Sequence, residues 1–298
     1  MKQREREVRR CATELLDELG VDVPPVDPVW IARQEGLSVE EKQLSTGVFG
    51  ALWKKGDDFG IIVSESCPTS GHRRFSLAHE LGHYHLDGHV DAMFVGGTTM
   101  VESQGGFFRN RRDPLEREAD WFASELLVPT ARLGSRIRDV APSIEVLRCL
   151  ADEFQTSLSM IAIRFSEISD GAVASVLSRE GQIEWAACSK RIREHDWSWG
   201  LGKRDSVPAG TATLGLARDR SALQSGETRT SSGLACEWFG GAPPELELEE
   251  DAIGLGTFGR VLTFLLLPDL PDPEDLAEHG DDDGPRDWRD AMRGFRMG

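Results

Sequence analysis

Two histidines four residues apart, with a glutamate directly after the first, place the strongest constraint on this chain. The run from Phe75 to His83 contains the pattern H-E-x-x-H, in which His79, Glu80 and His83 hold the fixed positions. On a helix, residues four apart share one face, so both imidazoles can point at a single ion. Glu80 lies about 100° further round the helix, where its carboxylate can reach a metal-bound water. The pattern is typical of the zinc-binding helix of a metallopeptidase; the alternative is a surface helix that carries two histidines.

A zinc site of this kind needs a third protein ligand and keeps a fourth position for water. The segment Asp113–Pro129 has apolar residues at helical spacing and a proline near each end, which predicts a second helix with a buried face. In it, Glu116 and Asp120 lie one turn apart, and Glu118 points away from that pair. We expect Glu116 to be the third ligand and Asp120 to accept the second ring N–H of a liganded histidine. For any one of these carboxylates, a solvated helix face is the alternative.

Two stretches of the sequence resemble the signature segments of the ImmA/IrrE family of metallopeptidases. They are R-R-F-S-L-A-H-E-L-G-H, ending at His83, and E-R-E-A-D-W-F-A-S-E-L-L-V-P, beginning at Glu116. In that family the first helix supplies two ligands and the catalytic glutamate, and the second helix supplies the third ligand. The resemblance therefore implies the same residues as the spacing: His79, His83 and Glu116 as ligands, and Glu80 as the catalytic residue. It extends roughly from the N-terminus to Ile168, with Val128 where the family usually has methionine.

The resemblance also implies an activity. It points to a zinc-dependent endopeptidase that cleaves a specific helix–turn–helix repressor and so derepresses stress-response or mobile-element genes. Manganese or another divalent ion could replace Zn²⁺ in the cell. The alternative is a non-hydrolytic, metal-stabilised interaction module that sequesters a regulator. Glu80 disfavours that alternative, since metal binding alone needs no carboxylate there. A third hypothesis is a phage- or toxin-linked regulator with a different target.

Charge and cysteine usage indicate a cytoplasmic protein with no general affinity for nucleic acid. The 298-residue chain has a formal net charge of −17 at pH 7, whereas nucleic-acid binding needs a cationic face. Its five cysteines are scattered and never form a C-x-x-C pair, so we expect reduced thiols, and Cys67 is not expected to be a ligand. The polar N-terminus does not fit a signal peptide. The apolar run 261–267 is too short to span a membrane.

We expect an α+β chain in four parts. Residues 1–135 are expected to form a zincin-like metallopeptidase domain, and residues 136–170 a helical, helix–turn–helix-like segment. Residues 171–267 are expected to form a β-rich α+β domain that senses a ligand or docks a partner. Residues 268–298, rich in acidic residues and proline, predict a disordered acidic tail.

The patterns of apolar residues and turn residues predict the individual elements. The expected helices outside the two signature segments span residues 3–19, 29–34, 131–138, 144–154 and 158–168. The expected strands span residues 48–53, 59–63, 172–177, 182–187, 234–239 and 261–267. One of the first two strands is expected to be the sheet edge that holds an extended substrate by main-chain hydrogen bonds.

The helix pair 144–154 and 158–168 resembles a helix–turn–helix, but its charge does not favour DNA binding. Residues 136–170 contain four arginines against six acidic residues, and Arg164 is the only basic residue on the second helix. We expect the pair to pack against the peptidase domain or a protein partner.

A long connection, Gly88–Arg112, joins the two signature segments. Connections of this length are usually functional or disordered, so it predicts either a lid or wall beside the metal, or a surface insertion. His72, His85 and His89 are expected to be polar surroundings of the site, and one of them could steady the oxyanion of a transition state.

Overall fold

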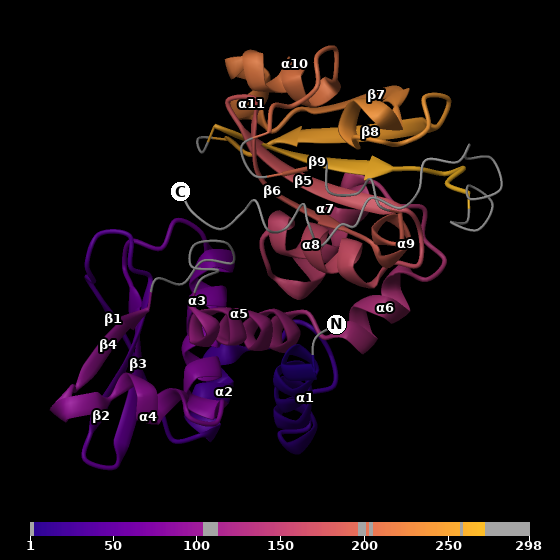
Figure 1. The fold of residues 1–298 in the computed structure, drawn as a ribbon. Helices are drawn as coiled ribbons and strands as arrows, with labels where there is room; N and C mark the ends of the chain where they lie inside the picture. The colour runs from indigo at the N-terminus through magenta and orange to yellow at the C-terminus, as the bar shows by residue number, and fades with distance from the viewer. Residues whose placement is uncertain (1–2, 104–112, 196–200, 203–204, 257–258, 272–298) are drawn as a thin grey trace. The chain divides into compact units, whose positions relative to one another are not determined.

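The computed structural model describes residues 3–103, 113–195, 201–202, 205–256 and 259–271. The chain divides into two compact units, residues 1–268 and residues 269–298, and nearly all of the described chain belongs to the first. Figure 1 shows helices and two separate sheets in that unit, which confirms the mixed α+β prediction. The boundaries near 135 and 170 stay predictions, and the predicted acidic tail lies almost wholly outside the described residues. Among the described residues, no helix combines the length and apolar character of a membrane span.

The first sheet has four strands in the order β1-β3-β2-β4. They are β1 (Ser38–Lys42), β2 (Gly50–Lys55), β3 (Asp58–Ser64) and β4 (Met100–Ser103). β1 and β3 are parallel, and the other two pairings are antiparallel. The predicted strands 48–53 and 59–63 correspond to β2 and β3, which both lie inside the sheet. The prediction that one of them forms the edge is therefore wrong, because β4 pairs along the outer side of β2. Four residues give too short a pattern for β4 to be recognised from sequence.

Several helices accompany this sheet. They are α1 (Gln3–Glu18), α2 (Pro28–Gln34), α3 (Ser70–His85), α4 (His89–Met93) and α5 (Pro114–Leu127), with the short 3₁₀ helix η1 (Val95–Gly97). α3 contacts β2 and β3, and α5 packs between α3 and α1. The connection after α3 therefore contains α4, η1 and β4 instead of one open loop. Residues 104–112 of this connection lie outside the described residues, and its role as a lid or wall stays a prediction.

Helix starts follow the expected capping chemistry. The Thr69 hydroxyl accepts a hydrogen bond from His72 N at the start of α3. The Asp113 carboxylate accepts one from Leu115 N at the start of α5, where Pro114 fills the first helical position. Such caps satisfy backbone N–H groups that have no partner within the helix.

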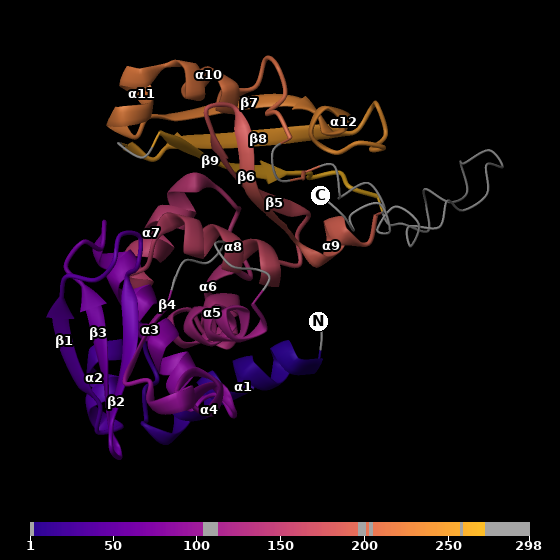
Figure 2. The ribbon, with the colours of Figure 1, turned by 60° about the vertical axis from the view of Figure 1, so that its left-hand side comes forward.

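The helical segment has the predicted elements. α6 (Thr130–Ile137) precedes α7 (Ile144–Phe154) and α8 (Leu158–Ile168). α8 packs against β5 and β6 of the second sheet, as Figure 2 shows, and Arg164 on it is 1% exposed. Arg164 binds Glu125 of α5 at 2.6 Å. The only basic side chain of α8 is therefore part of the interior and is not available to a DNA groove.

The second sheet is wholly antiparallel, in the order β6-β5-β9-β8-β7. Its strands are β5 (Val173–Arg179), β6 (Gln182–Cys188), β7 (Thr228–Leu234), β8 (Glu247–Gly254) and β9 (Arg260–Leu266). The short helices of this region are α9 (Lys190–Arg193), α10 (Ala212–Arg218), α11 (Arg220–Ser225) and α12 (Ala235–Trp238). α10 and α11 cover one face of the sheet and α8 lies on the other (Figures 1 and 2).

The predicted strand 234–239 is wrong. Leu234 ends β7, and the chain then turns into α12. The buried residues of this stretch are Ala235, Trp238 and Phe239, a spacing of three and four residues that suits a helical turn. β8 was not predicted, because its acidic sequence does not resemble a buried strand. Its Glu250 is nevertheless 3% exposed, since its carboxylate accepts hydrogen bonds from Thr213 and Ser231.

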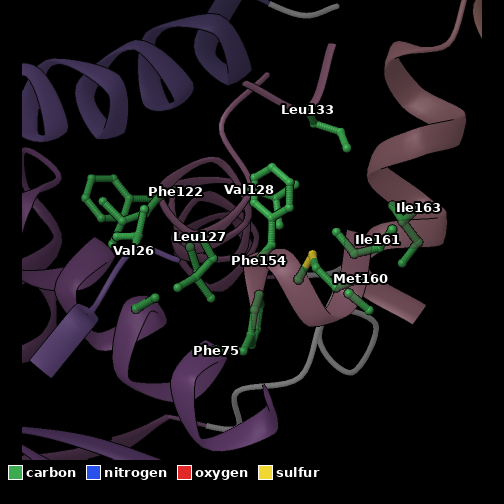
Figure 3. Packing of buried hydrophobic residues seen from close by; sticks show 14 of the residues in the cluster. Val26, Phe75, Phe122, Leu127, Val128, Leu133, Phe154, Met160, Ile161 and Ile163 are labelled. Carbon is green, nitrogen blue, oxygen red and sulfur yellow. The ribbon is translucent and has the colours of Figure 1, made fainter. Parts of the chain in front are cut away.

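One hydrophobic cluster links the helices to the second sheet. Figure 3 shows Phe75 of α3, Phe122 of α5, Phe154 of α7 and Met160 of α8 in this cluster. It continues to β9 through Phe165 and Phe264, whose rings meet edge to face at 5.3 Å. Because α3 and α5 both contribute to this cluster, their positions are fixed by the core, as a rigid site requires.

Candidate metal centre

Helix α3 holds His79 and His83 on one buried face. Both side chains are 1% exposed, and Glu80 beside them is fully buried. Their Nε2 atoms lie 3.0 Å apart. Since the residues are one helical turn apart, both rings are turned toward the same point.

Helix α5 brings Glu116 to that point because it crosses α3 at close range. A Cβ on Gly82 would lie 3.1 Å from the Cα atom and 3.2 Å from the carbonyl oxygen of Ala119. A larger residue at position 82 would push the two helices apart. The glycine in H-E-L-G-H therefore serves helix packing, and through it the approach of Glu116 to the histidines.

The three side chains form a group that can hold a metal ion, since their ligand atoms all lie within 4.8 Å of one another. Glu116 Oε1 is 3.3 Å from His83 Nε2, and Glu116 Oε2 is 3.5 Å from His79 Nε2. Tetrahedral zinc with ligands at about 2.0–2.2 Å separates those ligands by about 3.3–3.6 Å. The observed separations of 3.0, 3.3 and 3.5 Å are close to this value. Three acceptor atoms at such distances repel one another unless a cation or a proton lies between them, so the donor set fits a divalent ion.

Asp120 contacts the other side of one of these rings. Its Oδ1 atom lies 2.9 Å from His79 Nδ1. A carboxylate can only accept, so His79 donates from Nδ1, and its Nε2 is the nitrogen that faces the centre. This is the arrangement that orients histidine ligands in metal sites.

Comparison with known families agrees with this geometry. Residues 44–166 match the family described as Peptidase_M78: IrrE N-terminal-like domain. The chain contains an M78 peptidase domain. The resemblance seen in the sequence is thereby confirmed. The matched range includes α3 and α5 and leaves α1 and the second sheet outside it.

A solved structure titled "Mycobacterium tuberculosis transcriptional regulator" has a similar fold, with a TM-score of 0.52. The similarity covers 94% of this chain and 93% of that chain at 15% sequence identity. At that identity it shows fold alone, and it extends beyond the M78 domain into the second sheet. No curated protein matches the chain.

Glu80 of the M78 domain lies against β2. A Cβ on Gly50 would be 2.5 Å from Glu80 Oε1, so a side chain at position 50 would occupy the space of the carboxylate. Gly50 thus makes room for Glu80. Sequence reasoning did not identify it, because nothing local to β2 shows which residue of α3 it faces.

Charge interactions in the M78 domain shift several pKa values strongly. Burial acts to lower the pKa of His79, but hydrogen bonds with Asp120 and Glu116 outweigh it and raise the pKa to about 10. Burial lowers the pKa of His83 to about 4. Burial acts to raise the pKa of Glu116, but hydrogen bonds with the two histidines hold it far below its ordinary value. Without a metal, His79 and Glu116 therefore stabilise each other's charged forms, and metal binding is expected to release a proton.

His83 contacts His89, which was expected among the polar surroundings of the site, and His89 contacts Glu118, which was not. The His83 Nδ1 atom lies 3.0 Å from His89 Nδ1, and His89 Nε2 lies 3.3 Å from Glu118 Oε2. His89 is fully buried and Glu118 is 8% exposed. Glu118 does lie away from Glu116, as expected, but it is not on a solvated face. Its position on the buried side of α5 is the one sequence signal that could have drawn attention to it.

The two remaining histidines of the region lie elsewhere. The His72 ring meets the ring of Phe49 at 4.4 Å. His85 lies 3.7 Å from Glu35 and stacks on Phe122. Neither belongs to the metal-binding group.

Proposed function

We propose that this protein is a zinc-dependent endopeptidase that cleaves a specific transcriptional repressor and so derepresses stress-response or mobile-element genes. One observation carries the proposal: two imidazole Nε2 atoms and the Glu116 carboxylate converge beside the buried Glu80. The M78 domain match supports it, because the matched range contains all four residues.

The residues have distinct roles in this proposal. A divalent ion held by His79, His83 and Glu116 would act as a Lewis acid on the scissile carbonyl and on the attacking water. Glu80 takes the proton of that water and later gives it to the departing amine. Asp120 accepts from His79 Nδ1–H and so keeps the other ring nitrogen free to coordinate. Zinc suits two imidazoles and a carboxylate, although manganese is an alternative.

The proposed substrate is an extended segment of a helix–turn–helix repressor. β4 is the edge of the first sheet on the side of β2, and an exposed edge can pair with an extended peptide through main-chain hydrogen bonds. Gly50, which contacts Glu80, pairs with Ser103 of β4. This pairing brings the edge close to the site. The net charge of −17 favours a basic partner such as a DNA-binding protein.

We also propose that residues 171–267 sense a ligand or dock the partner and so bias the peptidase. α7 offers a physical connection. At its start, Ile144 N donates to Asp251 Oδ2 of β8 at 2.7 Å. Just after its end, Ser157 lies so near α3 that a Cβ on Gly71 would be 2.9 Å from Ser157 N. A displacement of β8 that moves α7 would therefore also shift the residues that contact the start of α3.

The metal is tested first. Purified protein should carry about one divalent ion per chain, and His79→Ala and Glu116→Ala should each lose it. Metal analysis of the purified proteins measures this. Undiminished zinc in both variants would reject the metal centre.

Glu80→Gln separates hydrolysis from sequestration. The variant should keep the metal and the fold but lose cleavage, because an amide cannot accept the water's proton. Each protein is co-expressed with the genomically adjacent helix–turn–helix regulators, and a single site-specific cut is sought by mass spectrometry. Glu14→Gln, on the exposed face of α1, is the matched control and should cleave normally. If Glu80→Gln derepresses target genes as well as the parent does, sequestration replaces hydrolysis. Rapid digestion of casein would contradict the specific substrate.

A further inference from the structure

The two imidazoles of the metal centre have unlike partners. On the side away from the metal-binding group, His79 Nδ1 contacts the Asp120 carboxylate directly, whereas His83 Nδ1 contacts His89, which in turn contacts the Glu118 carboxylate. We propose that His89 and Glu118 are positioning residues that hold His83 in its metal-binding tautomer, with Arg4 as their anchor. This proposal rests on the metal centre proposed above.

The outermost contacts fix the direction of the hydrogen bonds. Glu118 Oε2 accepts from Arg4 Nε at 2.8 Å and from Arg4 Nη2 at 2.6 Å. An ionised carboxylate has no hydrogen to donate, so His89 Nε2–H must donate to Glu118. An imidazole has one N–H and one acceptor nitrogen. Because the N–H of His89 faces Glu118 at Nε2, its Nδ1 is left to accept from His83.

The tautomer of His83 follows from that acceptor nitrogen. The two Nδ1 atoms are 3.0 Å apart, so one donates and the other accepts. Because His89 Nδ1 accepts, His83 Nδ1 carries the hydrogen. His83 Nε2 is then left with its lone pair directed at the metal-binding group. At His79, Asp120 accepts from Nδ1–H in the same way, so Nε2 is the nitrogen that faces the metal-binding group in both residues.

Without Glu118, nothing would fix the direction of the hydrogen bond between His83 and His89. That bond could then reverse, with His89 Nδ1–H donating to His83 Nδ1 and the ring hydrogen of His83 on Nε2. That form of His83 cannot coordinate an ion, and apparent affinity falls with the fraction of protein in the competent form. Removal of such partners typically costs about 10–100-fold in metal affinity.

The anchor lies outside the matched family domain. Arg4 belongs to α1, whereas the match begins at residue 44. α1 is held on α5 by Arg9, which lies 3.4 Å from the buried Glu125. Arg4 itself is about half exposed, so its removal should weaken metal binding less than removal of His89 or Glu118. Arg4 thereby connects the N-terminal helix to the metal centre, through the side chains of Glu118, His89 and His83.

Position 89 gives the sharpest test, because one amide can reproduce both hydrogen bonds. In His89→Gln, the carbonyl oxygen can accept from His83 Nδ1–H while the NH₂ group donates to Glu118. His89→Leu can do neither. We measure the zinc Kd of the full-length metal-free proteins by competition with a chromophoric chelator, and the absorption spectrum of their Co²⁺ forms. His89→Leu should bind zinc about 10–100-fold more weakly with an altered cobalt spectrum, and His89→Gln should stay close to the parent.

The other members of the chain give independent readings. Glu118→Leu should weaken zinc binding as His89→Leu does, and Glu118→Gln should weaken it less, since its carbonyl oxygen still accepts from His89. Arg4→Met is compared with Arg10→Met, a matched change on the same helix where Arg10 is exposed and pairs with Glu14. Only Arg4→Met should alter the zinc Kd. Thermal unfolding of the metal-free proteins shows whether each variant is folded.

The outcomes separate this proposal from the one on which it rests. A parent protein that binds no zinc would refute the metal centre itself. A parent that binds zinc, with His89→Leu and Glu118→Leu binding equally well and unchanged cobalt spectra, would refute the positioning role alone. Folded His89→Gln that loses as much affinity as His89→Leu would also refute it. If His89→Leu does not fold, Glu118→Leu against Glu118→Gln and Arg4→Met against Arg10→Met decide the question.

Discussion

Replacing Gly50 by alanine should damage the chemistry while leaving the metal centre in place. The new Cβ would lie 2.5 Å from Glu80 Oε1 and 3.1 Å from its Cδ, whereas ordinary contact begins at 3.4 Å. Glu80 Oε1 must therefore move by roughly 0.9 Å, the difference between the 3.4 Å contact limit and the distance of 2.5 Å. Glu80 is fully buried, so it has little free space to move into.

The size of the effect follows from that displacement. A misplacement of about 1 Å in a reacting group can cost about 10²-fold in rate, so kcat/KM for the repressor should fall by about 100-fold. Zinc content should not change, because the three atoms nearest the new methyl group all belong to Glu80. The fold should lose only about 1–3 kcal/mol, the usual cost of overpacking.

The assay compares Gly50→Ala with Gly134→Ala in α6. A Cβ on Gly134 meets nothing within 4 Å, so this control should keep full activity and gain about 1 kcal/mol from helix propensity. Cleavage rate, zinc content and thermal unfolding are measured on the same preparations. Cleavage by Gly50→Ala at the parent rate would show that Glu80 is not the base, or that its position is not set by β2.

Two further predictions concern the interior. Glu125→Gln should lower the free energy of unfolding by about 3 kcal/mol, because it leaves the buried Arg164 without its closest carboxylate. Burial acts to raise the pKa of Glu125, but Arg164 and Thr130 hold it below its ordinary value. Its stabilisation is therefore complete above about pH 4.3 and is lost as the pH falls further. Denaturant titrations at several pH values should show less acid sensitivity in the variant, and equal sensitivity would contradict this. Asp251→Ala should lower stability by about 1 kcal/mol through the lost hydrogen bond to Ile144 N and alter cleavage at unchanged zinc content; unchanged cleavage would argue against α7 as a connection to α3.

Local patterns were sufficient for the helices of the site. The spacing of His79 and His83 and the helical period after Asp113 predicted α3 and α5, and they selected the three residues that the structure brings together. Asp120 was also found this way, since it lies one turn from Glu116 on the same helix. These features depend on intervals of three and four residues, which a helix converts directly into a shared face.

Short strands and short helices were harder to predict. The acidic strand β8 and the four-residue β4 lack the apolar alternation that marks a strand, and Leu234 to Phe239 combined apolar residues in a way that fits either element. In each case the decision came from neighbours: pairing with β2 for β4, and hydrogen bonds from Thr213 to the buried Glu250 for β8. These contacts come from residues distant in the sequence, so no local sequence pattern could predict them.

The sequence by itself determined which residues can coordinate a metal, because ligand chemistry and helical spacing are both local properties. Tertiary structure alone decided what surrounds them. Arg4 lies 114 positions before Glu118 and yet binds it at 2.6 Å, and Gly50 makes room for Glu80 across the boundary between strand and helix. Such contacts depend on how α1, α5 and the first sheet pack, and packing is a property of the whole core. The ligand residues could therefore be predicted from the sequence, whereas the contacts that hold them in position depend on the tertiary structure.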